Sequence, residues 1–533
     1  MKLLDAAAKD DVQRVIDANH RALQAIPGFV HAEPGFPLVD GRILTEPAII
    51  AFVAGQAHDA GTDGVRPPAS LGPYSVFVMQ ASPRMQLSML PGFAPGPTLD
   101  GPESRAQTYV PIDGNPIDQR FDVRWPMLCH ISPDAGWPTL EKFLKATRET
   151  LTIAMYDFNA TYIAKVFTEA VLQHGLTVVM TWDNVMKDGE KELLANLRQE
   201  LDTRFDCWEV RHGNGRRFDS AYHPKVAVRD SSSFWLSSGN WSKNSQPEID
   251  PVKKCDQRRG MFTKRNRDWH IVVDDEPLAR LFEQYITYDR DESKREADEA
   301  IPSFTELIDE QHLPDLFVSL DAFADADALQ DVPEPIPPER LPSTPRVVSV
   351  QPVLTPDNYH PRLMELLRAA KHSIDIQFAY IRYNEQDGEL PENAGFVELL
   401  ELLRELSHQS TKTLRIIQSG DADDLCRLVA FGVDQSVIKT QSTVHNKGII
   451  VDQEIVLVSS ANWSFDGVLR NRDAGLIIYD EEIASYYQRA FDYDWNHRAS
   501  GYIQPDPDVR IAPDDAAPPE GMVRIAWHDY YDD

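Results

Sequence analysis

The chain has 533 residues, of which 84 are Asp or Glu and 53 are Lys or Arg, and its formal net charge is −31. Its four cysteines are dispersed without a Cys-x-x-Cys pair, which argues against a disulfide scaffold, a zinc knuckle or an iron–sulfur protein. We expect a cytoplasmic protein, because no apolar run reaches the roughly 18–20 residues of a membrane span and the first residues lack a signal-peptide core. The acidic total opposes nonspecific binding to DNA or to an anionic membrane.

Composition and hydrophobic pattern predict six segments in chain order. Residues 1–90 should form a small α+β domain, to which we can assign no role, since a helical pattern from Val12 to Ile26 precedes alternating strands and turns. The remaining segments are a Pro/Gly-rich connection, a first α/β half, an acidic Pro-rich linker, a second α/β half and an acidic flexible tail: residues 91–126, 127–290, 291–345, 346–500 and 501–533.

The two α/β halves are predicted from an internal repeat. The segment ISPDAGWPTLEKFLKATRETLTIAMYDF, which begins at Ile131, aligns without a gap with LTPDNYHPRLMELLRAAKHSIDIQFAYI, which begins at Leu354. Each copy has a Pro-Asp turn, apolar residues at helical spacing and a β-branched strand. The correspondence returns in AYHPKVAVRDSSSFWLSSGNWS and TVHNKGIIVDQEIVLVSSANWS. One α/β unit is therefore present twice.

Each repeat contains the pattern His-x-Lys-x4-Asp in an apolar run. A His and a Lys two residues apart on a β-strand share one face, so a potential nucleophile and a cation point into the same space. Ten residues after each Asp comes an Asn in a Ser-Ser-x-Asn block, and an Asn-Arg-Asp triplet follows further on. The candidate residues are His223, Lys225, Asp230, Ser238, Asn240 and Asp268 in the first half, and His445, Lys447, Asp452, Ser460, Asn462 and Asp473 in the second.

A lone match to such a short pattern is weak, whereas two matches at equivalent positions of a repeat favour a functional role for the His and Lys pairs. Trp241 and Trp463, which follow the two Asn residues, are expected to fill the core instead of contacting substrate. Asp230 and Asp452 could equally hold the strand end and the following loop together.

With these motifs, roughly residues 125–500 resemble the phospholipase D superfamily, whose HKD motif is His-x-Lys-x4-Asp followed by a Gly/Ser-Ser-x-Asn block. The resemblance implies an α/β fold of two pseudo-symmetric halves, each a mixed sheet flanked by helices, with one active site at their interface. It also implies a monomer and no cofactor or metal. The implied catalytic residues are His223, Lys225, Asp230, Asn240, Asp268, His445, Lys447, Asp452, Asn462 and Asp473, and the implied substrate-binding residues are Lys225, Lys447, Asn240, Asn462, Ser238 and Ser460.

The residue types suit phosphodiester cleavage. Two ammonium groups and two amides can stabilise charge on a phosphate, and one neutral and one protonated His can act as nucleophile and acid. By analogy with the superfamily, His223 is expected to form a phosphohistidine and His445 to act as acid and then base, although pseudo-symmetry allows the reverse. We expect Asp268 to orient His223 and Asp473 to orient His445.

Three hypotheses for the function remain open, and the first two differ in the substrate. The first is a phospholipid head group, favoured by the resemblance of HNKGIIVD and SSANWS to phospholipases, and a cardiolipin synthase is disfavoured because those enzymes usually carry membrane spans. The second is a nuclease, favoured by residues 211–267, which hold 13 basic and five acidic side chains and could form either a positive collar or a solvated loop paired with the acidic linker. The third is a noncatalytic binding scaffold.

Overall fold

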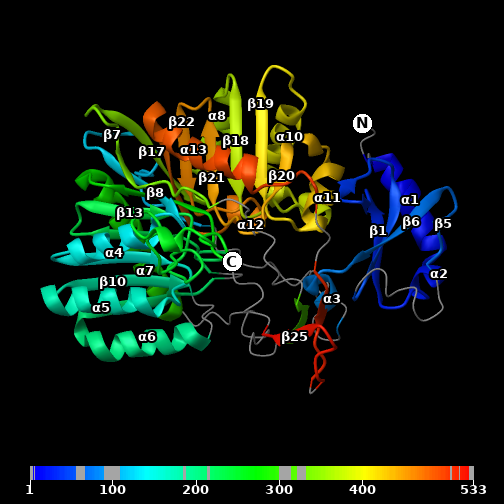
Figure 1. Ribbon diagram of the computed structural model, residues 1–533, viewed down its shortest axis with the longest axis horizontal. Helices are drawn as coiled ribbons and strands as arrows, with labels where there is room; N and C mark the ends of the chain where they lie inside the picture. The colour runs from blue at the N-terminus through cyan, green and yellow to red at the C-terminus, as the bar shows by residue number, and fades with distance from the viewer. Residues whose placement is uncertain are drawn as a thin grey trace.

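The computed structural model describes residues 4, 6–55, 67–88, 90, 109–183, 188–212, 216–298, 314–320, 332–503, 507–514 and 516–526. Figure 1 shows two α/β layers stacked on one another, with a separate N-terminal unit beside them. Among the described helices, none combines the length and apolarity needed to cross a membrane.

The first half is an eight-stranded mixed sheet in the order β11-β10-β9-β12-β13-β14-β8-β16, in which β9, β10 and β11 run parallel and the other pairs antiparallel. Its elements are β8 (Met127–Ser132), α4 (Gly136–Ala146), β9 (Thr150–Met155), α5 (Thr161–His174), β10 (Thr177–Asp183), α6 (Asp188–Leu201), β11 (Phe205–Val210), β12 (Val226–Arg229), β13 (Ser233–Ser237), β14 (Asp268–Val273), α7 (Glu276–Asp298) and β16 (Glu339–Leu341).

The second half repeats this topology in the order β20-β19-β18-β21-β22-β23-β17-β7. Its elements are β7 (Phe121–Val123), β17 (Val348–Thr355), α8 (Tyr359–Ala369), β18 (Ser373–Phe378), α9 (Glu385–Gly388), α10 (Ala394–Ser407), β19 (Thr413–Gln418), α11 (Ala422–Phe431), β20 (Ile438–Thr440), β21 (Lys447–Val451), β22 (Ile455–Ser459), α12 (Phe465–Leu469), β23 (Asp473–Tyr479) and α13 (Glu481–His497). The predicted fold class, two pseudo-symmetric α/β halves, is confirmed.

Three cores hold these layers together. Helices α4, α5 and α6 cover the outer face of the first sheet, and α8, α10 and α11 cover that of the second. A third core combines side chains of both sheets with the apolar faces of α7 and α13, so the halves are packed into one body. Trp241 and Trp463 are fully buried in the two outer cores, as predicted.

The segments between and after the halves contain more structure than composition suggested. Strand β7, from the predicted connection, pairs with β17 of the second half, and β16, from the acidic linker, pairs with β8 of the first. Helix α7 continues past residue 290 into the acidic linker. The tail is also not simply flexible, because β24 (Val509–Ile511) and β25 (Met522–Ile525) pair with β15 (Leu316–Ser319) through alternating apolar side chains. Residues 91–108, 299–313, 321–331 and 527–533 lie outside the described residues.

The N-terminal unit is a four-stranded sheet covered on one face by two short helices. It contains α1 (Ala6–Ala18), α2 (His20–Gln24), β1 (Phe29–Gly35), β4 (Ala48–Val53), β5 (Ser70–Leu71) and β6 (Tyr74–Gln80), with the small β2 (Leu38–Val39)–β3 (Arg42–Ile43) ladder and α3 (Pro83–Ser88). It lies beside α11 (Figure 1), where Arg427 pairs with Glu33 at 3.0 Å.

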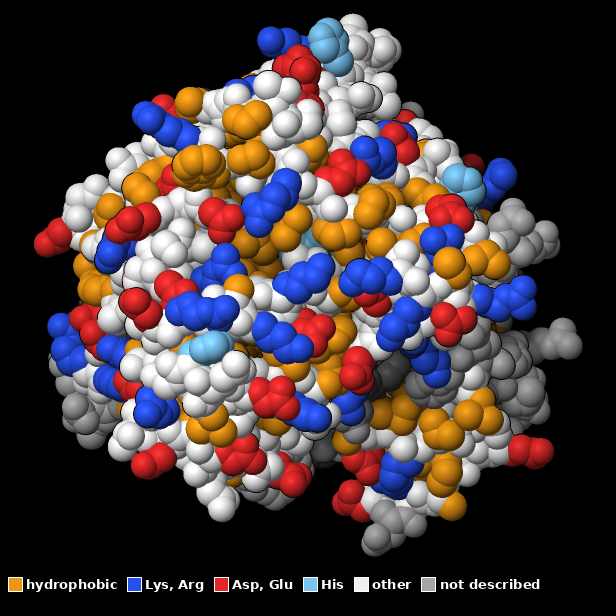
Figure 2. All heavy atoms as spheres, turned by 60° about the vertical axis from the view of Figure 1, so that its left-hand side comes forward, with side chains coloured by type: hydrophobic (Ala, Val, Ile, Leu, Met, Phe, Trp, Pro, Cys, Tyr) orange, Lys and Arg blue, Asp and Glu red, His pale blue; other side chains and the backbone are white. Residues whose placement is uncertain are grey.

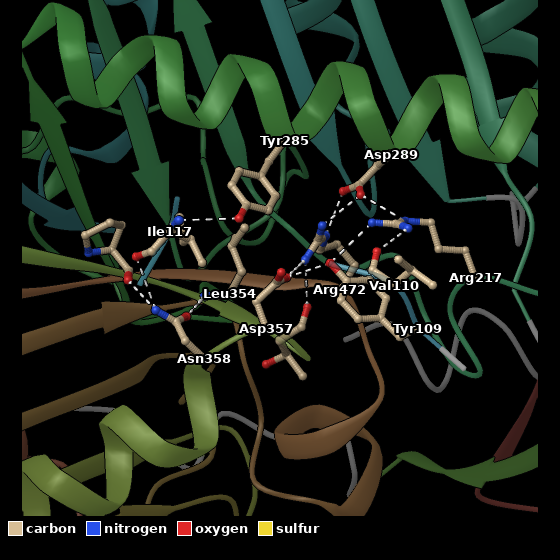
Figure 3. Close-up of polar contacts among 12 residues, drawn as sticks. Tyr109, Val110, Ile117, Arg217, Tyr285, Asp289, Leu354, Asp357, Asn358 and Arg472 are labelled. Carbon is tan, nitrogen blue, oxygen red and sulfur yellow. Dashed lines mark hydrogen bonds and ion pairs between the residues drawn. The ribbon is translucent and has the colours of Figure 1, made fainter. Parts of the chain in front are cut away.

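Two buried arginines, one from each Asn-Arg-Asp triplet, cross the interface between the halves. Figure 3 shows Arg472 reaching up to Asp289 of α7, in the first half, and sideways to Asp357 of its own half. Nε and Nη2 of Arg472 each donate to an oxygen of the Asp289 carboxylate at 2.7 Å, and Nη1 lies 2.5 Å from Oδ2 of Asp357. Arg267 repeats this arrangement with Asp494 of α13 at 2.9 Å and Asp134 at 2.5 Å.

We predict that Arg472→Met destabilises the protein by about 3–5 kcal/mol, because it leaves Asp357 buried without a counter-charge and Asp289 with Arg217 alone. The matched control is Arg280→Met on the surface of α7, whose ion pair with Glu276 is 61% exposed on both sides and should contribute less than about 0.5 kcal/mol. Urea unfolding at pH 7, followed by circular dichroism, measures both. Equal losses in the two variants would show that the buried pair does not hold the halves together.

Candidate active site

Each histidine stands just before a central strand of its own sheet, at the junction between the halves. The backbone N–H of His223 donates to the carbonyl of Arg472 at 2.8 Å, and that of His445 donates to the carbonyl of Arg267 at 3.2 Å. These short parallel bridges join a motif strand of one half to the Asn-Arg-Asp triplet of the other. The two histidines, 5% and 4% exposed, are therefore brought together although 222 residues separate them in sequence.

Each imidazole is held by an acid from the opposite half. Nδ1 of His223 lies 2.7 Å from Oδ1 of Asp473, and Nδ1 of His445 lies 2.8 Å from Oδ1 of Asp268. The predicted pairing within each half is therefore wrong. The physical reason is the backbone bridge, because each acid directly follows the arginine that bonds to the other half's histidine strand.

The protonation states follow from burial and the neighbouring charges. Burial acts to raise the pKa of Asp473, but the His223 imidazole and Lys225 outweigh it and hold this pKa below its usual range. In the same way, His445 and Lys447 hold the pKa of Asp268 below its usual range. Burial, and then the Lys225 ammonium, lowers the pKa of His223 to about 4.

The pKa of His445 is also lowered, by burial and then by Lys447. An ionised carboxylate can only accept hydrogen bonds, so in each pair Nδ1 carries the hydrogen and Nε2 carries the lone pair. Both histidines are thus poised as bases or nucleophiles at neutral pH.

The two motif lysines share the same buried space. Lys225 and Lys447 have no exposed surface, and each Nζ donates to the backbone carbonyl of its own histidine, at 2.8 Å and 2.6 Å respectively. Burial, and then repulsion from Lys447, lowers the pKa of Lys225 far below its usual value. An anion that enters between the two ammonium groups would relieve both effects.

The serines that precede each Asn orient the acids. Ser238 Oγ donates to Oδ1 of Asp268 at 2.9 Å, and Ser460 Oγ donates to Oδ1 of Asp473 at 2.6 Å. Each hydroxyl also accepts a backbone N–H and is fully buried. The prediction that Ser238 and Ser460 bind substrate does not match this geometry, since both hydroxyls are already engaged within the protein.

The two motif asparagines are also buried near the histidines, with Asn240 1% and Asn462 4% exposed. Within the described part of the chain, Oδ1 of Asn462 has no hydrogen-bond partner, and this residue lines the cavity beside His223. Substrate binding by the two asparagines stays a prediction.

The last residue of each His-x-Lys-x4-Asp pattern lies away from the histidines. The Asp230 carboxylate accepts the backbone N–H groups of residues 148–150, and that of Asp452 accepts those of residues 371–373. Because a strand of four or five residues lies between each Lys and its Asp, and a strand rises about 3.3 Å per residue, each Asp lies at the end of the strand opposite to the histidine. Of the two roles that the sequence left open, the geometry supports the structural one, and the predicted catalytic role for Asp230 and Asp452 does not fit.

A cavity of about 560 Å³ lies against His223. The first half contributes Tyr156, whose ring meets the His223 imidazole edge-on at 4.6 Å, together with residues 220 and 221. The second half contributes residues from two segments, 380–393 and 462–471. The site is therefore built from both halves. Across the described ranges, no group of three His, Cys, Asp or Glu side chains is arranged to hold a metal ion.

The basic run at residues 211–267 does not form a continuous positive collar. Arg216, Arg217 and Arg267 are at most 6% exposed, and Arg217 pairs with Asp289 at 3.3 Å. Arg258 binds Glu334 of the acidic linker at 2.7 Å, as the solvated-loop alternative predicts. Figure 2 shows Lys and Arg interspersed with Asp and Glu on one face of the molecule.

Sequence reasoning missed the arginines of the two triplets. It used only the Asp of each Asn-Arg-Asp and counted Arg267 as surface charge, although the whole triplet is identical in both repeats. The identical triplets were a signal in the sequence that could have identified these arginines, because an arginine that only lies on the surface is not expected at the same position in both repeats. It also missed Tyr156, which has no counterpart at the equivalent Ala379.

The chain is similar to one family model and to several solved structures. Residues 363–495 match the family model described as cardiolipin synthase, PLD-like domain. Among solved structures, phosphatidylserine synthase from Haemophilus influenzae Rd KW20 is 13% identical over 71% of this chain and 90% of its own, with a TM-score of 0.44. Nuc, a phospholipase D family member from Salmonella typhimurium, is 17% identical over 28% of this chain and 97% of its own, with a TM-score of 0.22. No curated protein matches the chain in sequence.

The two α/β halves each supply a His, a Lys and an Asn to one buried centre. The second half matches the PLD-like family model, and the first half repeats its His-x-Lys-x4-Asp motif and its sheet topology.

We predict that Asp473→Asn, and not Asp268→Asn, changes the titration of His223. The Asp473 carboxylate favours the imidazolium form of His223, so its removal should lower the pKa of His223 below about 4 and keep the ring neutral to lower pH. Nitrogen-15 NMR of labelled histidines from about pH 3 to pH 8 measures this, with His223→Ala and His445→Ala spectra giving the assignments. A change of the His223 signals in Asp268→Asn alone would contradict the crossed pairing.

Proposed function

We propose that the protein is a phosphodiesterase that cleaves its substrate in two steps through a phosphohistidine. The observation that carries this proposal is the pair of crossed His–Asp contacts flanked by two buried lysines. Neutral imidazoles with a fixed tautomer supply nucleophile and base, and the ammonium groups stabilise negative charge on the phosphoryl oxygens.

In the first step, Nε2 of His223 attacks phosphorus and the bond to the leaving oxygen breaks. Nε2 of His445, protonated in the substrate complex, gives its proton to that oxygen. In the second step His445 takes a proton from water, the resulting hydroxide attacks phosphorus, and the phosphorus–nitrogen bond breaks. His445 must gain a proton when substrate binds, and the phosphate anion favours this by opposing the effect of Lys447 on the His445 pKa.

Two observations favour His223 as the nucleophile. His223 lines the cavity, and no described residue hydrogen-bonds to its Nε2. By contrast, Nε2 of His445 lies 2.9 Å from Nζ of Lys447, which engages its lone pair until a ligand draws the ammonium away. The imidazole that faces the cavity is therefore the better placed to attack.

The cavity and the surface charge favour a phospholipid head group over a nucleic acid. Buried or paired arginines remove much of the basic run that a polyanion would need. The cavity wall mixes amides and charges of both signs, which suits a small polar group.

The test is turnover of phosphatidylcholine and phosphatidylethanolamine vesicles beside single- and double-stranded DNA, with and without EDTA. We expect release of head group, unaffected by EDTA, and a loss of at least about 10³-fold in both His223→Ala and His445→Ala. Acid quenching should trap labelled phosphate on wild type and none on His223→Ala. Asp452→Asn, which changes a motif residue outside the site, is the control and should keep kcat in the folded protein.

Each alternative has its own outcome. Cleavage of DNA without lipid turnover would assign a nuclease. A trapped adduct that survives in His223→Ala would reverse the roles of the two histidines. Inactivity of wild type on all these phosphodiesters would support a binding scaffold and overturn the proposal.

A further inference from the structure

One contact distinguishes two histidines that the repeat otherwise makes nearly equivalent. Each motif lysine donates to the backbone carbonyl of its own histidine, at 2.8 Å for Lys225 and 2.6 Å for Lys447. Only Lys447 also reaches the imidazole, with Nζ 2.9 Å from Nε2 of His445. Among the described residues, no such bond joins Lys225 to Nε2 of His223. An ammonium group therefore engages the lone pair of one imidazole, and its counterpart in the first half does not.

The residue that follows the inner strand of each half differs between the halves. Tyr156 is the first residue after β9, and the repeat places Ala379 at the same point after β18. The Tyr156 ring meets the His223 imidazole edge-on with the two centroids 4.6 Å apart, and Nζ of Lys225 lies over the same ring, 5.0 Å from its centroid. The methyl group of Ala379 offers Lys447 no aromatic face.

The ring gives the ammonium group of Lys225 a second partner. An ammonium group over the face of a tyrosine is attracted by the negative potential of the ring, and this attraction is stronger where the groups are withdrawn from water. Lys225 is fully buried and Tyr156 is half-buried. Such a contact is comparable in strength with one hydrogen bond, so it can decide which of two nearby partners the ammonium group takes.

The middle residue of each motif also differs, with Pro224 in the first half and Asn446 in the second. Because alternate residues of an extended segment point to opposite faces, neither side chain lies on the face of its lysine. Asn446 Nδ2 donates to Gln377 at 3.3 Å. This difference therefore does not bring an ammonium group to either imidazole.

A neighbouring charge is the alternative that an experiment must separate from the ring. Asp157, which the repeat aligns with Tyr380, favours the ammonium form of Lys225 through its negative charge. Its carboxylate already accepts a hydrogen bond from Nδ2 of Asn159 at 3.1 Å. The ring of Tyr156, by contrast, lies against both the ammonium group and the imidazole.

We propose that Tyr156 is the positioning residue that makes the two histidines different. Its ring holds the ammonium group of Lys225 away from Nε2 of His223, so this imidazole keeps its lone pair for attack on phosphorus. His445, which has Lys447 on its Nε2, is left to act as acid and base. The inference rests on the proposed function and deepens it, because it names the group that assigns the two roles.

Diethyl pyrocarbonate tests this in the free protein, because it modifies a neutral imidazole nitrogen whose lone pair is available. Labelling rates of single histidines at neutral pH, read by mass spectrometry, should be about tenfold higher at His223 than at His445, since a hydrogen bond from an ammonium group contributes on this scale. In Tyr156→Leu, which keeps apolar bulk without an aromatic face, the rate at His223 should fall and the ratio should drop below about twofold. Tyr156→Phe keeps the ring and should retain the tenfold ratio.

A fall in labelling at His223 is specific to the proposed role. Loosened packing at residue 156 would open the cavity and raise the labelling of His223, which is the opposite change. The exposed His20 is the internal reference for the reagent. If the Leu side chain is not accommodated, Tyr156→Ala is the second variant, and the same fall is expected.

Several results would overturn the inference. They are equal labelling of the two histidines in wild type, an unchanged ratio in Tyr156→Leu and Tyr156→Ala, and loss of the preference in Tyr156→Phe. Asp157→Asn separates the ring from the charge and should keep at least about a fivefold ratio. Loss of the preference in Asp157→Asn alone would show that this carboxylate, and not the ring, places Lys225.

Bis(p-nitrophenyl) phosphate separates this inference from the proposed function. Attack by Nε2 forms the phosphorus–nitrogen bond and releases p-nitrophenolate, so acid quenching and mass spectrometry locate the adduct. It is expected on His223 in wild type and on both histidines in Tyr156→Leu. If wild type turns over the diester and both proteins carry the adduct on His223 alone, the phosphodiesterase stands and the role of Tyr156 is wrong. If wild type cleaves no diester while the labelling follows the expected pattern, Tyr156 positions Lys225 and the proposed function fails instead.

Discussion

The structure depends on two buried arginines that cross between its halves. Arg267 and Arg472 each bridge an acid of their own half and an acid on a long helix of the other, with 1% exposure. Isolated buried ions are costly, so these pairs stabilise the protein only when both halves are docked. The same residues use their backbone to hold the histidine strands of the opposite half. Docking of the halves and assembly of the site are therefore one event, and neither half can orient its own histidine alone.

This arrangement explains why the charge total is a poor guide to the chemistry. The net charge of −31 describes the surface as a whole, whereas the centre contains two lysines that repel each other and two histidines kept neutral by burial. Under the proposed function, a phosphate group would offer negative charge to the lysines and a phosphorus atom to a neutral imidazole. The acidic net charge opposes the approach of polyanions.

The sequence predicted the repeat, the α/β class and the location of the histidines and lysines, because an internal duplication shows up directly as aligned letters and strand periodicity. It could not predict which acid meets which histidine, since Asp268 and Asp473 are equivalent in sequence and only the docking of the halves decides between them. The roles predicted for the serines and for the last Asp of each motif were wrong for a related reason. Spacing along a strand predicts which face of the sheet a side chain lies on, but not which hydrogen bonds it already makes within the protein. The tail strands were not predicted because the tail is rich in Pro and Asp, its apolar alternation is short, and its strands pair with a segment that is distant in sequence.

The proposed function requires that the two motifs form one phosphate site. Calorimetric titration with tungstate, a tetrahedral phosphate analogue, tests it most directly in wild type, Lys225→Met and Lys447→Met. One composite site predicts one tungstate per chain in wild type and no measurable binding in either variant. Two tungstates per chain, or one that persists after loss of either lysine, would show that the halves act separately and would contradict the account.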